Sequence, residues 1–237
     1  GVRYVSAASS LKSSHCDREY SVTMTGLQPA LGAGFGCGTI VGMDSLRPRR
    51  SVLFMPGANA RALEKARSID CDGIIIDLED AVAPDLKVEA RERAAGVVKE
   101  HPYGYREVAI RVNGMDTQWY HDDLVAAVAA GPDAIAVPKV SSAEQVRAIV
   151  ADMEAAGADK SVKLWAMIET PRAVLDCLDI AEASDRLTVL IMGTNDLTKE
   201  LRASHVAGRA PVVTALQICM LAARAAGTAI LDGVYND

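Results

Sequence analysis

From Arg49 to its end, the chain repeats one pattern: a short run of β-branched residues ends in polar residues and is followed by an alanine-rich amphipathic segment. The runs predict strands at 51–56, 73–78, 107–112, 134–139, 163–168, 187–193 and 228–234. Helices are predicted between them, near 59–69, 85–100, 119–130, 142–157, 171–183 and 211–226. Strands that alternate with helices predict an α/β fold with a parallel sheet and right-handed crossovers.

Two arrangements of such a sheet are open, an open Rossmann-type sheet and a closed barrel. No GxGxxG motif follows the first predicted strand, which weakens a dinucleotide site. A run of seven βα units points to eight, and so to a TIM (β/α)₈ barrel. Because the chain stops just past the seventh predicted strand, we expect an incomplete barrel without its eighth βα unit.

Residues 1–42 differ from the rest, since they are rich in Ser and Gly and show neither strand nor helix periodicity. We expect this segment to be disordered, or to be upstream sequence before a true start at Met43, and we assign 43–237 to the incomplete barrel domain. The uncharged stretch that begins at Ser21 is too diluted by Gly, Thr and Pro for a membrane span. No basic region of a signal peptide adjoins it.

Composition excludes several classes of partner and site. The net charge is −6 and there is no Lys/Arg run, so we expect no nucleic-acid partner and no membrane partner. The five cysteines are widely spaced without a CxxC pair, and the four histidines form no HExxH pattern. A disulfide framework and a zinc site are therefore not predicted. Reduced thiols favour a cytoplasmic protein.

Ionisable residues follow nearly every predicted strand. In a βα barrel the chemistry lies at these carboxyl ends. The residues concerned are Asp77, Glu79, Asp80, Arg111, Lys139, Glu169 and Asp196. Clustered carboxylates repel one another unless a cation lies among them, and Mg²⁺ typically binds one or two carboxylates and keeps several waters. Glu169 and Asp196 follow neighbouring strands and can share one ion.

Three of these residues also have an ordinary structural interpretation. Asp80 can begin the following helix. Arg111 can pair with a nearby carboxylate, or its planar fork can bind a substrate carboxylate. Lys139 as a Schiff-base lysine requires a desolvated amine, and the carboxylates around it oppose that role. We therefore favour a structural or phosphate-binding cation at Lys139.

Six short motifs occur in order along the chain. They are RSVLFMPG at 50–57, DLEDAV at 77–82, IRVNG at 110–114, PKV at 138–140, IET at 168–170 and GTNDL at 193–197. Together they resemble the HpcH/HpaI aldolase and citrate lyase β-subunit family. The longer strings RVNGMDT, LWAMIET, MGTNDLTKEL and LDGVYND are most similar to its malyl-CoA lyase and (3S)-malyl-CoA thioesterase branch.

The resemblance implies a Mg²⁺-dependent TIM barrel of the phosphoenolpyruvate/pyruvate-domain type that assembles as a homo-oligomer, a trimer or hexamer. It implies Glu169 and Asp196 as metal ligands. It implies that Arg111 binds substrate oxygens and steadies an enolate, and that Glu79 and Asp80 orient metal-bound water.

The resemblance further implies that the backbone amides of Gly193, Thr194 and Asn195 hold a substrate carboxylate. The family continues with an eighth strand and a C-terminal segment, or lid, whose catalytic Asp reaches a neighbouring subunit. No matching eighth strand or lid follows the seventh predicted strand, so we expect both to be missing from this chain.

The implied activity is that of a C–C lyase acting on a hydroxyacyl-CoA of the malyl-CoA, citramalyl-CoA or citryl-CoA type. The partners would be a CoA thioester and a small 2-oxo acid such as glyoxylate. A (3S)-malyl-CoA thioesterase would share the metal residues, so the two activities stay open. An inert fragment or a binding module is the third alternative.

Overall fold

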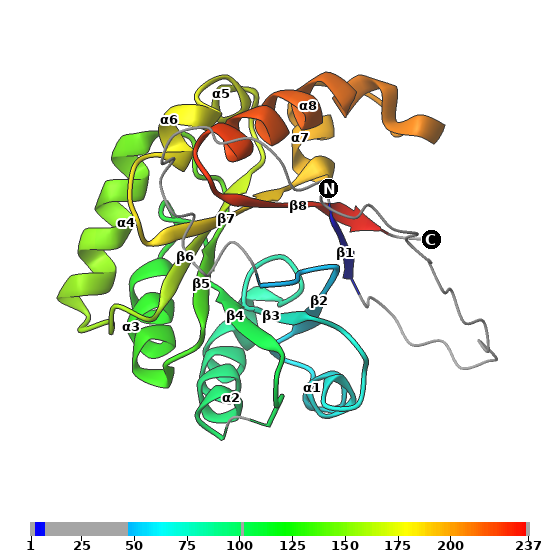
Figure 1. Ribbon diagram of the computed structural model, residues 1–237. Helices are drawn as coiled ribbons and strands as arrows, with labels where there is room; N and C mark the ends of the chain where they lie inside the picture. Colours follow the sequence, from blue (N-terminus) through cyan, green and yellow to red (C-terminus); the bar gives the residue numbers. More distant parts are fainter. Residues whose placement is uncertain (1–2, 8–46, 101, 236–237) are drawn as a thin grey trace, which may run out of the picture.

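The computed structural model of this chain describes residues 3–7, 47–100 and 102–235 (Figure 1). Seven strands form one curled parallel sheet, and an eighth, β1, pairs with both of its edges and closes it into a barrel. The strands are β1 (Arg3–Ala7), β2 (Ser51–Pro56), β3 (Gly73–Asp77), β4 (Glu107–Arg111), β5 (Ala134–Val137), β6 (Lys163–Ile168), β7 (Leu187–Met192) and β8 (Ala229–Tyr235).

Helices cover the outside of this barrel, as the ribbon shows (Figure 1). They are α1 (Ala60–Ala66), α2 (Lys87–Lys99), α3 (Tyr120–Ala130), α4 (Ala143–Ala155), α5 (Pro171–Leu175), α6 (Cys177–Ala181), α7 (Thr194–Glu200) and α8 (Ala210–Ala225). Short 3₁₀ turns, η2 (Pro84–Leu86) and η3 (Ala207–Arg209), precede α2 and α8. The order of strands and helices is that of successive βα units, as predicted.

The seven predicted strands coincide with β2 to β8 to within two residues at each end. The predicted helix at 171–183 is divided into α5 and α6, because Asp176 between them leaves the helical conformation (φ −96°, ψ 14°). Helix α7 was not predicted. Its sequence, TNDLTKE, is short and mostly polar, so it offers no periodic apolar stripe.

The expectation that residues 1–42 contain no strand is wrong for Arg3–Ala7, which pair in parallel with β2 and β8. Without them, β2 and β8 would each present an edge of unpaired backbone groups, and such edges accept a strand through N–H and C=O groups alone. A hydrophobic pattern is therefore not required. Residues 8–46 lie outside the described part of the chain, so the domain boundary at 43 stays a prediction, as does the missing eighth βα unit.

Side chains fill the interior of the barrel. The inward residues are Val52, Phe54, Ile75, Ala109, Ala134, Ala136, Trp165, Met167, Val189, Ile191 and Leu231. Trp165 is fully buried, and three small alanines in this layer leave the volume that its indole occupies. The barrel is thus a packed core, and the next inward positions towards the carboxyl ends line its mouth.

Candidate active site at the carboxyl ends of the strands

Strand alternation places Asp77, Arg111 and Glu169 in the mouth of the barrel, because each lies two residues beyond an inward residue of the core. Asp77 and Arg111 are register partners on β3 and β4. The Arg111 Nε and Nη2 atoms each donate to one Asp77 oxygen over 2.6 Å. Both side chains are buried, Asp77 to 1% exposure. The fork-to-fork contact fixes the plane of the guanidinium.

The outer nitrogen of this guanidinium faces Glu79. Arg111 Nη1 lies 2.8 Å from Glu79 Oε2, although that oxygen accepts no well-aligned hydrogen bond. Lys139 Nζ lies 3.3 Å from the other oxygen, Oε1. Burial raises the pKa of Glu79, and the charge of Arg111 partly opposes the rise. For Arg111, burial opposes the charged form, but the carboxylates of Asp77 and Glu79 outweigh it and hold its pKa above the ordinary value.

Glu169 follows β6 and is the most buried carboxylate of the predicted metal pair, at 2% exposure. Its Oε2 accepts the backbone N–H of Lys139 over 2.8 Å. Lys139 has a positive φ of 56°, a conformation that costs energy for a residue with a side chain. Burial, with the charge of Glu79 added, raises the pKa of Glu169 to about 7. The group can therefore hold or release a proton near neutral pH.

Gly193 allows the Glu169 side chain to lie where it does. A Cβ atom at Gly193 would stand 2.3 Å from Glu169 Cγ and Oε1, so any other residue would displace the carboxylate. The Gly193 N–H donates to the carbonyl of Ile168 over 3.0 Å. This amide therefore already has an acceptor in the β6–β7 ladder, and its binding of a substrate carboxylate stays a prediction. The predictions for Thr194 and Asn195, the first residues of α7, stay open.

The remaining predicted residues lie around this cluster. Asp196 is half-buried in the first turn of α7, and its charge raises the pKa of Glu169 and of Lys139. Asp80 is exposed on the loop after β3. Thr194 is buried, and Asn195 is exposed. The structure thus brings Arg111, Glu79 and Glu169 together, with Asp196 near Glu169 and Asp80 turned to solvent.

The residues present fit a hard divalent cation. No three His, Cys, Asp or Glu side chains form a ready metal cage within the described ranges. Mg²⁺ does not require one, since one or two carboxylates and water suffice. A buried oxygen of Glu79 without a hydrogen bond and a desolvated Glu169 both gain from a nearby positive charge.

The raised pKa of Glu169 should make the stability of the metal-free protein depend on pH. Its carboxyl pKa is raised from 4.5 to about 7 in the native state, so between these values the native state holds a proton that the unfolded chain has lost. This contribution to stability is present below pH 4.5 and is lost as the pH rises through about 7. We expect the free energy of unfolding in urea to fall more between about pH 5 and about pH 8 for wild type than for Glu169→Gln. Equal losses would contradict the assignment.

A set of buried polar residues behind the mouth was not predicted from the sequence. Lys87, Asn113 and Asp123 are all buried and join the loops after β3 and β4 to α2 and α3. At β8, Arg209 holds the buried Asp232 through two contacts of 2.8 Å. A lysine or asparagine within a helix or loop carries no periodic signal, so only the folded contacts identify them.

A cavity of about 360 Å³ lies beside this site, between α7 and the start of α8. It is lined by Thr194, Asn195, Thr198, His205, Arg209, Val234 and four further residues. Two of these lining residues, Thr194 and Asn195, are also predicted substrate-binding residues.

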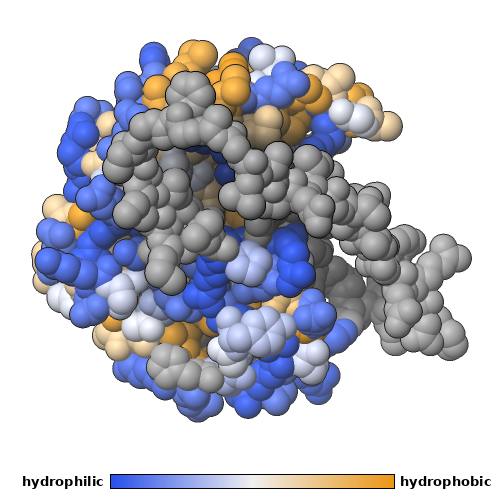
Figure 2. Space-filling model, viewed as in Figure 1, coloured by the Kyte–Doolittle hydropathy of each residue, from blue (hydrophilic) through white to orange (hydrophobic). Residues whose placement is uncertain are grey.

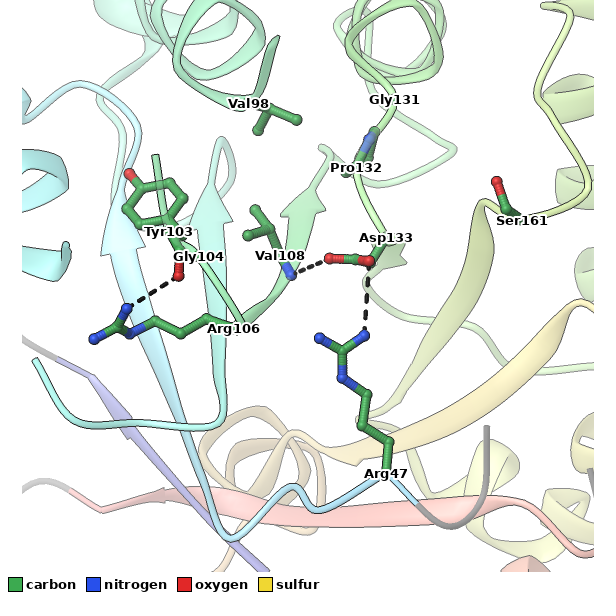
Figure 3. A pocket seen from close by; sticks show the side chains of 10 residues that line it. All are labelled: Arg47, Val98, Tyr103, Gly104, Arg106, Val108, Gly131, Pro132, Asp133 and Ser161. Atoms are coloured by element: carbon green, nitrogen blue, oxygen red, sulfur yellow. Dashed lines mark hydrogen bonds and ion pairs between the residues drawn. The ribbon is translucent and has the colours of Figure 1, made fainter. Parts of the chain in front are cut away.

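A second cavity, of about 240 Å³, lies at the opposite end of the barrel, where β4 and β5 begin (Figure 3). The charged groups that line it are engaged in contacts within the protein. Asp133 accepts the backbone N–H of Val108 over 2.8 Å and lies 3.7 Å from Arg47, and Arg106 donates to the carbonyl of Tyr103. Residues at this end of a βα barrel generally contribute to stability. We therefore place the candidate active site at the carboxyl ends alone.

The described helices include none that is both long and apolar enough to cross a bilayer.

Comparisons with known proteins agree with the geometry. The HpcH/HpaI aldolase/citrate lyase family matches residues 50–237. A (3S)-malyl-CoA thioesterase of Cereibacter sphaeroides is 49% identical over 80% of this chain and 64% of its own length. The citrate lyase subunit beta of Escherichia coli is 34% identical over 81% of this chain and 65% of its own. The chain thus spans slightly less than two thirds of these relatives.

Solved structures of citrate lyase beta subunits and CitE proteins are also similar to this chain. The citrate lyase beta subunit of Mycobacterium tuberculosis superposes with a TM-score of 0.66 at 28% identity, over 81% of each chain. A CitE protein of that organism in complex with magnesium, acetoacetate and coenzyme A has a TM-score of 0.63 at 28% identity, over 78% of this chain and 66% of the other.

Proposed function

Because this chain belongs to the HpcH/HpaI aldolase/citrate lyase family, which consists of enzymes, we propose that the full-length protein acts with Mg²⁺ on the CoA thioester of a small hydroxy acid of the malyl type. The observation that carries the proposal is the buried cluster of Arg111, Glu79 and Glu169 in the barrel mouth. It joins a fixed cation to a desolvated carboxylate where βα barrels act on substrates.

Glu169 and Asp196 are the residues that would hold Mg²⁺, with Glu79 and Asp80 orienting its water. Bound there, the ion would act as a Lewis acid towards a substrate carbonyl. Two observations support this assignment: Asp196 is close enough to Glu169 to shift its pKa, and the matching CitE structure contains magnesium.

The first candidate reaction is cleavage of the C–C bond. The hydroxyl of the malyl group loses its proton, the bond between its C2 and C3 breaks, and the electron pair passes to the thioester as an enolate that is then protonated. The products are glyoxylate and acetyl-CoA. Arg111 is suited to meet negative charge that develops on oxygen, since Asp77 holds the plane of its guanidinium and Nη1 lies against Glu79.

The second candidate is hydrolysis of the thioester. Water adds to the thioester carbonyl and the C–S bond breaks, giving malate and free CoA. The same charged cluster would stabilise the oxygen anion of that addition. The 49% identity to thioesterases supports hydrolysis at least as well as cleavage.

Product analysis decides between them. We expect full-length protein, supplied with malyl-CoA and Mg²⁺, to form glyoxylate and acetyl-CoA if it is a lyase, and malate and CoA if it is a thioesterase. Chelation with EDTA should stop either reaction. If neither pair of products forms with Mg²⁺ present, the proposed function is wrong.

Assembly as a homo-oligomer is also proposed. Apolar side chains are exposed on α5, α6 and α8, where Figure 2 shows apolar surface towards the top of the molecule. Leu175 is 73% exposed and Leu221 is 69% exposed. Large exposed apolar residues that gather on one face are typical of contact surfaces.

A further inference from the structure

We infer that Lys87 is a positioning residue of the active site: its ammonium group holds the loop after β3, and with it Glu79, in place against Arg111. The inference rests on the proposed function, because Glu79 matters only if the barrel mouth is the catalytic centre. Lys87 does not reach the mouth itself and is assigned no contact with substrate.

The contacts of Lys87 are unusual for a lysine. It is the first residue of α2, yet it is only 5% exposed. Its Nζ donates to the carbonyls of Leu78 and Glu79 and to Asn113 Oδ1, each over 2.7 Å. An ammonium has three N–H groups, and all three are used. The ring of Trp119 lies 5.3 Å from the same nitrogen.

Burial of a charge is costly unless other groups replace its water. Here burial lowers the pKa of Lys87, while the charges of Asp77 and Glu79 favour its protonated form. The three acceptors are neutral, and two of them are backbone carbonyls of the Glu79 loop. A neutral side chain of similar length would remove the ammonium donor from both carbonyls, and each would keep one donor, Asn113 Nδ2 for Leu78 and the Val82 amide for Glu79. The geometry therefore makes the position of the loop depend on this cation.

Asn113 extends the same restraint to the loop after β4. Its Nδ2 donates to the Leu78 carbonyl over 3.0 Å and to Asp123 Oδ2 over 2.5 Å. Asp123 is completely buried and also accepts Arg91 Nε over 2.7 Å. Lys87 and Asn113 thus fix the Leu78 carbonyl from two sides, between α2 and α3.

The loop in turn determines where Glu79 meets Arg111. The amides of Glu79 and Ala81 donate to the two oxygens of Asp77 over 2.9 and 3.0 Å. These are the oxygens that hold Arg111. A shift of the loop would therefore move Glu79 and loosen the Asp77–Arg111 contact together. Displacement of a catalytic group by about 1 Å can lower the rate about 100-fold.

The test uses the full-length protein and three variants. Lys87→Met removes the ammonium. Lys99→Met makes the same change at an exposed residue of the same helix. Val98→Ala weakens the buried packing of α2 far from the mouth. For each, we would measure kcat and KM with malyl-CoA and Mg²⁺, the Tm, and amide hydrogen exchange at Glu79 and Ala81.

We expect Lys87→Met to lower kcat about 100-fold, to change KM for malyl-CoA much less, and to speed exchange at both amides. Lys99→Met should match wild type. A wild-type kcat in Lys87→Met would overturn the inference. So would an equal loss of kcat in Val98→Ala at a similar Tm, because lost stability would then explain the effect.

Failure of the proposed function can be told apart from failure of this inference. If wild type turns over no malyl-CoA, the proposed function fails, and hydrogen exchange alone decides whether Lys87 holds the loop. Faster exchange at Glu79 and Ala81 in Lys87→Met, but not in Lys99→Met, supports that role. Unchanged exchange overturns it.

Discussion

Arg111→Met is expected to lower the free energy of unfolding by about 3–5 kcal/mol, because it leaves a buried carboxylate without its partner. Asp77 is 1% exposed and receives two short hydrogen bonds from Arg111. The kcat should fall about 100-fold to 1,000-fold, which is the usual effect of removing one oxyanion donor. Urea unfolding monitored by circular dichroism gives the first quantity, and product formation from malyl-CoA gives the second.

The double variant Asp77→Asn/Arg111→Met separates the two effects. It removes the unpaired charge, so much of the lost stability should return, whereas turnover should stay low. A single-variant cost of less than about 1 kcal/mol would show that water reaches Asp77 and that the pair is not a buried one. Recovered turnover in the double variant would remove Arg111 from the proposed mechanism.

Glu169→Gln is expected to abolish stabilisation by Mg²⁺. A ligand that binds only the folded state stabilises it by about 2.7 kcal/mol at 100 times its dissociation constant. We therefore expect Mg²⁺ to raise the Tm of wild type. Glutamine keeps the volume but not the charge of Glu169, so the Tm of the variant should not respond. Differential scanning calorimetry with and without Mg²⁺ measures both shifts.

A matched control is Glu92→Gln, the same change at an exposed residue of α2. It should show the wild-type response to Mg²⁺. If Glu169→Gln responded as strongly as this control, Glu169 would not be a metal ligand, and the cation would have to bind through other oxygens.

The positions of the strands were predictable because each is a β-branched run with polar residues after it. The strand Ile74-Ile75-Ile76 before Asp77 is an example, since it is fully buried on both faces as a parallel barrel strand must be. Because the carboxyl ends of parallel strands lie at one end of the barrel, Arg111, Glu79 and Glu169 were predicted to lie near one another. The structure places them together there. Their roles stay proposals.

Features that depend on backbone pairing and on packed volume were not predictable. The strand Arg3–Ala7 pairs with β2 and β8 at the two edges of the sheet. The amide of Gly193 is used within the sheet, and the need for glycine there comes from the carboxylate of Glu169 on the neighbouring strand. The role of Lys87 depends on carbonyls that become neighbours only when two loops and two helices have assembled.

The positions of the two tryptophans give the protein two separate optical probes. Trp165 is fully buried inside the barrel, with the Arg49 guanidinium carbon 5.7 Å from its ring centre, so its fluorescence should be that of an indole shielded from water. Trp119 is half-buried beside the ammonium of Lys87. Phe in place of Trp119 would leave an emission that reports opening of the barrel, and Phe in place of Trp165 would leave one that follows the loops around the mouth.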